Sequence, residues 1–535
     1  MNRLLSLFVF ALSLLAGFVV AGEKAADKQA EEFPPKPQVP YLSAADELKS
    51  FVLPEGYRME LVLDESSIKE PVVCVFDGNG RMYVCEMRTY MQDIDGSKEH
   101  DPVGRVSRHE TTKGDGVFDK HLVYADKMVL PRMVLPLDDR VLINETNTND
   151  IFIYKDTKGD GVSDKKDLWY AGGPRGGNLE HQQSGLVWCM DNWMYQTYNA
   201  YRLRFTGTGK DPLKESTGGN GGQWGCNQDS FGKMWFSNAG GEKGFVSIQV
   251  PILYGGIDLP EQQPTDFLDV WPLVGLGDVQ GGHGRHRATD YTLNHMTASC
   301  GHEIVRGDRM PQDLQGDALI CEPVGRLIRR AKVENREGMT TIKNIYDKKE
   351  WIASNDPNFR PVNIANGPDG CLYIVDMYRG IIQEGNWVKE GSYLRKVVKQ
   401  YGLDKNAGRG RIWRLVHKDF QPGPQPRMLD ETPAQWVKHL EHPNGWWRDT
   451  AQKLIVVRGD KSVVPALVEM AKTNKNQLAR IHAMWTLEGL DALEKDFVLG
   501  LLKDEDPKVR VAAIRVSESL YNKGCLLYTS DAADE

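Results

Sequence analysis

The chain has 535 residues, of which 66 are basic and 74 acidic, so its formal net charge is −8. Apolar residues make up 40% of it, which is enough for a buried core and excludes a disordered or low-complexity chain. Eight cysteines are too few for a disulfide scaffold, and the acidic balance argues against nucleic acid as a partner. The 53 glycines favour short strands and tight turns over a helical bundle.

The chain begins with a predicted secretory signal peptide over residues 1–21. Arg3 precedes an apolar run from Leu4 to Ala21 that ends in small residues. We therefore expect an exported protein, periplasmic or secreted. Retention of the run as a membrane anchor is the alternative, because its length is close to that of a membrane span. Residues 22–42 are charged and Pro-rich, which is typical of a solvated linker.

A short pattern recurs between residues 43 and 418 and indicates a mainly β fold. Gly or Asn stands three positions before an aromatic residue, with Met or Leu just ahead of that aromatic, at 79–83, 191–195, 231–235 and 369–373. Gly and Asn tolerate a positive φ in a hairpin turn, and the apolar–aromatic pair starts the next strand. Two turns are 232 − 192 = 40 residues apart, about one four-stranded blade. We predict a six-bladed β-propeller.

The pattern becomes helical after a Pro-rich stretch at 422–426. Arg-x-x-Ala recurs at Arg448, Arg480 and Arg510, at intervals of 480 − 448 = 32 and 510 − 480 = 30 residues. Asp506 followed by Pro507 is typical of the start of a helix. We predict HEAT-like helical hairpins over residues 428–524, which would form a docking surface for a protein partner.

The last segment, residues 525–535, matches no periodicity in the helices before it. It resembles the translation of a sequencing adapter read through at the end of a genomic fragment. We therefore expect the natural protein to continue beyond Gly524.

His181 is the first candidate catalytic residue. It lies just before a predicted strand, 184–188, whose turn is 191–192, and this places it at one rim of the propeller. Loops from several blades converge at such a rim, and an imidazole there can act as the general base for an alcohol proton. The alternative is a histidine that makes only a structural hydrogen bond.

Three arginines are candidates for binding a carboxylated cofactor. Arg285 and Arg287 lie in the Gly-rich loop 281–287, and Arg379 follows the end of a predicted strand. Arginine forms bidentate pairs with carboxylates. The alternative for the loop is a solvated segment without a ligand.

The repeated Lys-Gly-Asp-Gly segments, at 113–116 and 158–161, suggest a calcium loop. Asp156, Asp160 and Asp164 would converge on one ion. Lys158 stands where such a loop would carry Asp or Asn, so a polar hairpin tip is the alternative.

Two cysteines, Cys74 and Cys85, bracket one of the turns and are compatible with facing positions across that hairpin. A disulfide between them is one expectation, and buried free thiols are the other.

Several of these segments resemble one family, the membrane-bound dehydrogenase propellers of planctomycete and verrucomicrobial type. The resemblance runs from about Leu42 to Gly524 and is carried by Pro54–Tyr57, Asp77–Tyr83, the Gly-Asp-Gly hairpins, Phe359–Val362, Gly367–Tyr373 and Asn444–Ala451. That propeller is in turn similar to the soluble glucose and sorbosone dehydrogenases, which use pyrroloquinoline quinone. In them a histidine ahead of a Gly-Pro-Asp-Gly-x-x-Tyr-type turn takes the substrate proton, and His181 matches that position. Trp188-Cys-Met-Asp191 departs from the usual Phe-Gly-Pro-Asp.

The resemblance implies an exported quinoprotein-type dehydrogenase that oxidises a sugar or a sugar-derived alcohol or aldehyde. Its cofactors would be pyrroloquinoline quinone and Ca²⁺, and its electrons would pass to a c-type cytochrome in cis or in trans. Haem c would then belong to a domain downstream of this sequence. The alternative is a noncatalytic glycan- or protein-binding propeller. Basic groups converging with His181 would favour the enzyme, whereas an apolar or aromatic rim would favour binding.

Overall fold

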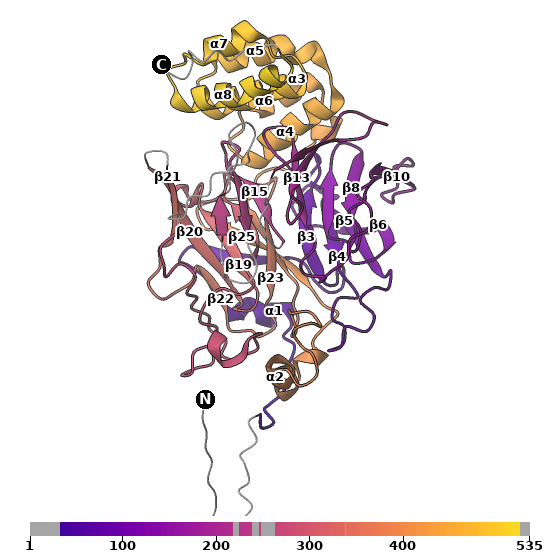
Figure 1. Ribbon diagram of the computed structural model, residues 1–535, viewed down its shortest axis with the longest axis vertical. Coiled ribbons are helices and arrows are strands. Elements are labelled where there is room, and N and C mark those ends of the chain that lie inside the picture. The colour runs from indigo at the N-terminus through magenta and orange to yellow at the C-terminus, as the bar shows by residue number, and fades with distance from the viewer. Residues whose placement is uncertain (1–32, 218–223, 238–244, 248–262, 337–338, 525–535) are drawn as a thin grey trace, which may run out of the picture.

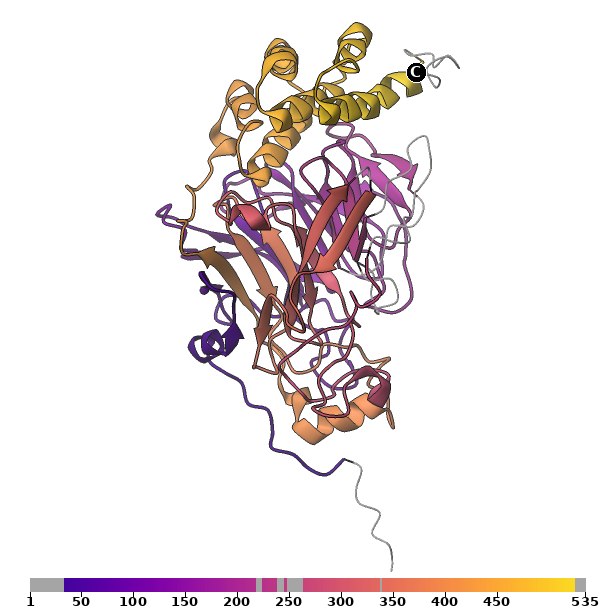
Figure 2. The same ribbon diagram turned by 90° about the vertical axis from the view of Figure 1, so that its left-hand side faces the viewer.

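A computed structural model gives the structure of the chain and describes residues 33–217, 224–237, 245–247, 263–336 and 339–524. The body is mainly β, and a helical segment lies across one end of it (Figure 1, Figure 2). Helix α2 (Tyr393–Tyr401) lies at the opposite end. Within these ranges no helix has both the length and the apolar character needed to cross a membrane. The predicted signal peptide and the tail 525–535 lie outside the described residues.

Most strands form antiparallel units of four that follow the order of the chain. The first unit contains β3 (Pro71–Phe76), β4 (Met82–Glu86), β5 (Gly104–Glu110) and β6 (Lys120–Met128). The next two units share one eight-stranded sheet, in which β7 and β11 pair in parallel. Their strands are β7 (Met133–Pro136), β8 (Arg140–Asn144), β9 (Ile151–Lys155), β10 (Lys165–Tyr170), β11 (Gly185–Trp188), β12 (Met194–Gln196), β13 (Tyr201–Arg204) and β14 (Leu213–Ser216).

Two further sheets follow along the chain. The three-stranded sheet contains β15 (Cys226–Gln228), β16 (Met234–Ser237) and β17 (Phe245–Ser247). The six-stranded sheet adds β1 and β22 to a run of four, and its strands are β1 (Phe51–Val52), β18 (Cys300–Ile304), β19 (Ala318–Glu322), β20 (Leu327–Arg336), β21 (Met339–Asn344) and β22 (Ile352–Ser354).

The last unit is completed by a strand from near the beginning of the chain. It contains β23 (Pro361–Asn366), β24 (Leu372–Asp376), β25 (Arg411–His417) and, at its edge, β2 (Tyr57–Leu63). Tyr57 pairs with His417, so the two ends of the β region are joined by strand hydrogen bonds. The first strands of successive units contact one another in the closed order β3, β7, β11, β15, β18, β23 and back to β3. The units therefore form a ring.

The recurring turn pattern is confirmed at the level of the backbone. Gly80, Asn192, Gly232 and Gly370 have φ values of +73°, +63°, +75° and +80°. Each of these turns joins the first strand of a unit to its second strand. The predicted residue types therefore stand where the left-handed backbone conformation requires them.

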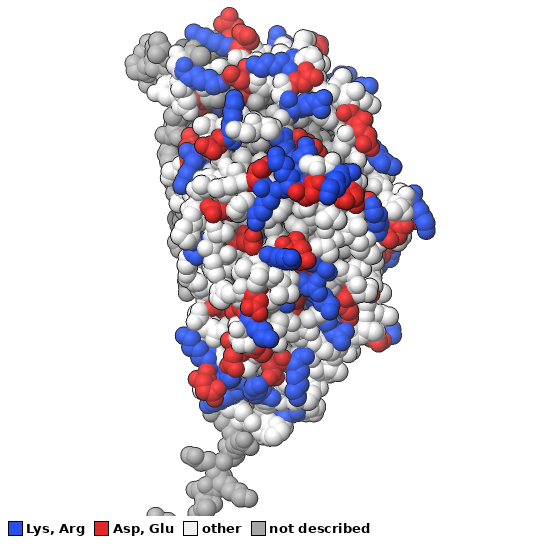
Figure 3. All heavy atoms as spheres, turned by 90° about the vertical axis from the view of Figure 1, so that its right-hand side faces the viewer, with Lys and Arg blue, Asp and Glu red and all other residues white. Residues whose placement is uncertain are grey.

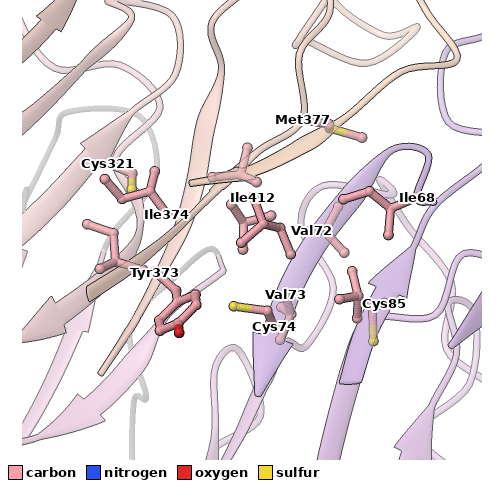
Figure 4. Close-up of a cluster of buried hydrophobic side chains, with 14 of the residues drawn as sticks. Ile68, Val72, Val73, Cys74, Cys85, Cys321, Tyr373, Ile374, Met377 and Ile412 are labelled. Atoms are coloured by element: carbon pink, nitrogen blue, oxygen red, sulfur yellow. The ribbon is translucent and has the colours of Figure 1, made fainter. Parts of the chain in front are cut away.

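The first strands of the units, which contact one another around the ring, are its inner strands. The apolar core includes residues of these strands and of the strands next to them. Residues from β3, β19, β24 and β25 meet in one apolar cluster, in which Val72, Cys74, Ile374 and Ile412 lie close together (Figure 4). Cys74 pairs across the hairpin with Val84, and Cys85 pairs with Val73. Successive residues of a strand point to opposite faces, so Cys74 and Cys85 do not face each other, and both are free thiols.

The helical segment consists of hairpins in two layers. Its helices are α3 (Pro433–His439), α4 (Gly445–Arg458), α5 (Val464–Thr473), α6 (Gln477–Gly489), α7 (Lys495–Leu501) and α8 (Pro507–Asn522). Helix α3 packs on α4, α5 on α6 and α7 on α8, and α4, α6 and α8 contact one another in turn. Asp506 caps α8 with Pro507 at its first position, as predicted.

Helix α4 joins this segment to the ring on the side of the turns. The side chain of Gln452 donates to the carbonyl of Met190 at 2.7 Å, and the Asn192 side chain in the turn donates to Trp485 O at 2.7 Å. The helices therefore cover one end of the axis around which the inner strands are arranged.

The segment just before the ring is bound to the structure. Residues 33–42 belong to the range predicted as a solvated linker, yet the Val39 amide donates to Tyr401 O at 3.0 Å and the Phe33 ring contacts Tyr393. The hydrogen bond and the ring contact hold this otherwise exposed segment along α2.

Candidate functional site

A pocket of about 200 Å³ lies on the axis of the ring, at the end opposite the helices. We call it the axial pocket. It is formed where the inner strands begin and by the loops around them, and Val72, Cys300 and Val362 belong to those strands. The other lining residues are Met87, Tyr90, Glu180, His181, Trp224, Gln280, Thr297, Ala298, Pro323, Met377, Ile382, Gln383 and Trp387. A pocket at the convergence of several loops is a preferred place for a ligand.

His181 lies in this pocket, as the sequence predicts. It precedes β11, its amide donates to Asn178 O at 3.1 Å, and its side chain is exposed. Its ring lies against that of Tyr198, with 6.0 Å between the ring centroids. The imidazole is thus positioned by one aromatic contact and is accessible to a ligand.

Glu180, which the sequence analysis did not single out, lies next to His181 on the pocket wall. Its Oε1 accepts hydrogen bonds from the Tyr90 hydroxyl at 2.6 Å and from the Glu384 amide at 2.7 Å. Burial raises the pKa of Glu180 to about 7, although those two donors act in the opposite direction. A carboxyl group with this pKa can hold or release a proton near neutral pH. In the sequence, only the position of Glu180 next to His181 could have indicated that Glu180 belongs to the site.

A network of side chains holds the Glu180–His181 segment in place. The Glu384 carboxylate accepts from the Leu179 amide at 3.0 Å and from the Asn178 side chain. The two segments are about 200 residues apart in sequence, and this contact fixes one against the other. The pocket wall therefore depends on a long-range contact.

Arg379 supports the pocket from behind. Its guanidinium is buried and donates to Glu70 at 2.8 Å and to the carbonyls of Tyr90 and Met91 at 2.9 and 2.6 Å. It also lies over the Tyr90 ring. Arg379 thus positions Tyr90 and does not line the pocket, so its contact with a cofactor stays a prediction.

Arg285 and Arg287 do not line the axial pocket either. Arg287 donates to the carbonyls of Leu293 and Val270 at 2.6 and 2.8 Å, which are contacts within its own loop region. The Arg285 side chain contacts His295 at 2.5 Å. Gln280, which precedes this loop, lines the pocket, and none of Arg285, Arg287 and Arg379 lines it together with His181.

Asp156, Asp160 and Asp164 do not form a metal site in the structure. Asp156 accepts from the amides of Gly159 and Gly161, each at 2.7 Å, and Asp164 accepts from the Thr157 amide at 2.9 Å. Across the described ranges, no group of three or more His, Cys, Asp or Glu side chains could hold a metal ion. The carboxylates instead cap a polar hairpin tip, which was the alternative.

The lining of the axial pocket does not fit pyrroloquinoline quinone. This cofactor carries several carboxylates, which need cationic partners. None of the described lining residues is Lys or Arg. Arg132 lies over the Trp224 ring at 4.7 Å but is itself buried and outside the lining, and burial lowers its pKa to about 9.

The raised pKa of Glu180 predicts a pH effect on stability. The folded state binds this proton more tightly than the unfolded state, so the contribution of Glu180 to stability falls as the pH rises from about 4.5 to about 7. The free energy of unfolding of wild type should fall over that range, and the fall should be about 1–2 kcal/mol smaller in Glu180→Gln, after allowance for solvent screening. Urea unfolding at pH 5 and pH 8 measures this. Glu390→Gln, at an exposed carboxylate, should follow wild type, and identical pH profiles for all three proteins would contradict the assignment.

Comparisons with solved structures find proteins of low sequence identity that cover about two thirds or more of the chain. The pyranose dehydrogenase PQQ domain from Coprinopsis cinerea is 11% identical, with 71% of this chain and 98% of that chain covered and a TM-score of 0.38. A Trichoderma reesei enzyme of Carbohydrate-Active Enzymes Family AA12 is 13% identical, with coverage of 69% and 98% and a TM-score of 0.39. The calcium-binding protein regucalcin from Agrobacterium tumefaciens is 12% identical, with coverage of 68% and 96% and a TM-score of 0.32.

These scores are too low to carry an argument about activity. No curated protein matches the chain. One family model does match, over residues 43–419, and its description is a domain of unknown function, DUF7133. Because the match spans well over half of the sequence, the chain belongs to the DUF7133 family.

Proposed function

We propose that the axial pocket binds a neutral carbohydrate-type ligand. Two polar atoms in its wall carry this proposal: Gln280 Oε1 and Thr297 Oγ1 are buried and have no hydrogen-bond partner among the described residues. An unmet buried polar atom costs about 1–3 kcal/mol, so a ligand that supplies its hydrogen bond is favoured. Both groups are uncharged, which suits the hydroxyl groups of a sugar or polyol.

Aromatic side chains support the same class of ligand. Tyr90, Trp224 and Trp387 line the pocket, and their rings provide flat apolar surfaces for the C–H faces of a sugar. The wall is therefore aromatic and amide-rich and carries no cation among its described members. This is the rim chemistry that favours binding.

Thr297→Val tests the proposal by removing one hydroxyl at nearly constant volume. Titration with a panel of neutral mono- and disaccharides, followed by calorimetry, should detect a ligand whose dissociation constant rises about five- to tenfold in the variant. The exposed Thr289→Val is the matched control and should bind as wild type does. The proposal would be refuted if no sugar of the panel bound, or if Thr297→Val bound its sugar as tightly as the control Thr289→Val.

A sugar dehydrogenase is the second candidate, favoured by the adjacent Glu180 and His181. His181 is accessible to a ligand in the pocket and would take the proton of a hydroxyl group, while Glu180 would hold a proton nearby at neutral pH. Oxidation would require the electron-accepting chemistry of a quinone, with a c-type cytochrome as the next acceptor, and the described lining does not fit that quinone. We therefore assign it no step.

Reconstitution separates the two candidates. The full chain with pyrroloquinoline quinone and CaCl₂ would reduce a redox dye in the presence of its sugar if it is a dehydrogenase. His181→Ala would abolish that turnover, and His439→Ala in α3 would not. Sugar binding without dye reduction supports the binding protein.

The β ring and the helical segment are each assigned an architecture. We infer that the ring is a six-bladed propeller, supported by the contact order of its inner strands and by the edge pairing of β2. We infer that α3–α8 form HEAT-like repeats that can bind a protein partner, because they are paired hairpins stacked in layers.

Export of the protein is inferred from the apolar run Leu4–Ala21. On the face shown in Figure 3, basic and acidic side chains are interspersed, which supports a partner other than nucleic acid.

A further inference from the structure

A second cavity, of about 190 Å³, lies between the ring and helix α4. We call it the inner cavity. Its walls are the inner strands β3, β11 and β23, and Asp449, Thr450 and Lys453 of α4 close it. Trp224 lines both this cavity and the axial pocket, so the two spaces share one wall. The sugar-binding proposal does not use this cavity.

Lys453 brings a positive charge into the inner cavity. The side chain is buried, and its Nζ donates to Pro136 O at 2.6 Å. No carboxylate of the described chain lies within ion-pair distance of it. An ammonium group has three N–H donors, so two remain for a ligand.

The carboxylate of α4 that lines the cavity with Lys453 is paired with another cation. Arg306 and Asp449 form a two-pronged ion pair at 2.6 and 2.8 Å, which uses both carboxylate oxygens of Asp449. Arg306 Nε is buried and has no hydrogen-bond partner among the described residues. The charge of Asp449 is therefore paired with Arg306, and Arg306 Nε adds an unused donor to the region.

Glu303 also lines the cavity, where its carboxyl group accepts hydrogen bonds from neighbouring residues. Its oxygens accept from Asn227 at 2.5 Å, from the Ile304 amide at 2.9 Å and from the Asn366 amide at 3.2 Å. Burial raises the pKa of Glu303 to about 8, which disfavours its charged form near neutral pH. The lining also includes Trp188, whose buried Nε1–H has no partner within the described ranges. Two buried donors without a partner, Trp188 Nε1 and Arg306 Nε, therefore belong to residues that line the cavity.

We propose that the inner cavity is a binding site for a small carboxylate or oxyanion, with Lys453 as its principal partner and Arg306 and Trp188 as further donors. The anion would contact both α4 and the ring. Its binding would therefore stabilise the attachment of the helices. A cation is disfavoured by Lys453, and a neutral apolar molecule would leave the donors unmet.

Thermal unfolding of the full chain tests the site. Sodium phosphate and sodium acetate are titrated at constant ionic strength with sodium chloride as the balancing salt, so that the two arms separate oxyanion from carboxylate. We expect a saturating rise in Tm for at least one of them. In Lys453→Met the apparent dissociation constant should rise at least tenfold, whereas Lys438→Met, at an exposed lysine of α3, should respond as wild type does.

A milder variant protects the test against misfolding of Lys453→Met. Trp188→Phe removes the Nε1–H donor while keeping an aromatic ring at this position, at the cost of some side-chain volume, and should weaken the response several-fold. Equal Tm shifts in wild type and in both cavity variants, or shifts that do not saturate, would overturn the proposal, because they would reflect general salt effects.

The pH dependence gives an independent readout. Burial lowers the pKa of Lys453 to about 8, and Glu303 ionises in the same range, so raising the pH above about 8 removes a positive charge and adds a negative one. Acetate keeps its charge over this whole range, so its binding should be constant between pH 6 and 7 and weaken above pH 8. The other titratable or charged groups facing the site or close enough to influence it are His302, Arg306, Asp449, Asp77 and Asp138. Binding that is unchanged up to pH 9 would contradict the role of Lys453.

Discussion

Asp278→Asn should lower the free energy of unfolding by about 3–5 kcal/mol, the range expected when one partner of a buried ion pair is removed. Asp278 is buried between two arginines: Arg326 donates to its carboxylate at 2.9 and 2.6 Å, and Arg360 donates at 2.9 Å. The amide side chain would leave two buried guanidinium groups facing each other without a counter-charge. Urea unfolding at pH 7 measures the loss.

The Asp278 carboxylate should also make the stability of wild type and of Asp278→Asn respond differently to acid. The two arginines hold the pKa of Asp278 below its ordinary value, so its contribution to stability is present above that ordinary value and is lost as the pH falls through the lowered one. Wild type should therefore lose more stability on acidification than Asp278→Asn. Glu334→Gln, which breaks an exposed pair with Lys343, is the control and should cost less than about 1 kcal/mol. If Asp278→Asn also lost less than about 1 kcal/mol of stability, the charges of the two buried arginines would not depend on Asp278 for compensation.

Asp449→Asn should cost about 2–3 kcal/mol and loosen the helical segment from the ring. The carboxylate of Asp449 in α4 binds Arg306 of the ring through both oxygens, and Arg306 is 4% exposed. The substitution leaves the guanidinium buried without its partner. Circular dichroism and tryptophan fluorescence, followed together during urea unfolding, report helix loss and ring loss.

Added anion should rescue this variant. If the inner cavity binds phosphate or acetate, the freed Arg306 becomes a second cationic partner, so the saturating Tm rise should be larger in Asp449→Asn than in wild type. Glu505→Gln, at an exposed carboxylate between α7 and α8, should change neither stability nor the anion response. Unchanged stability in Asp449→Asn would mean that the ion pair is not needed for docking.

Local features were predictable from the sequence because they depend on neighbouring residues. The hairpin turns at Gly80, Asn192, Gly232 and Gly370 follow from backbone conformations that few residue types adopt. The start of α8 at Asp506 and Pro507 follows from the unpaired amides of a helix N-terminus. His181 was placed at a rim because it directly precedes a strand.

The predictions for the cationic residues show the limit of local reasoning. Arg379 has the residue type for binding a carboxylate, but its partner, Glu70, lies 309 positions away and is inside the protein. The three aspartates of the hairpin tip have the residue type for binding calcium, but each of them accepts hydrogen bonds from backbone amides. A residue type alone does not tell which partner satisfies it.

The sequence by itself determined the mainly β character, the positions of the hairpin turns and the change to helices after residue 426, because each is set by periodicity or by a local conformational preference. Only the tertiary structure decided what the axial pocket and the inner cavity contain. Glu180 meets Tyr90, Lys453 enters the cavity from α4, and Arg132 stays outside the lining, because ring closure brings together segments up to hundreds of residues apart. Burial then sets the protonation of Glu180 and Glu303, and burial is a property of the assembled fold.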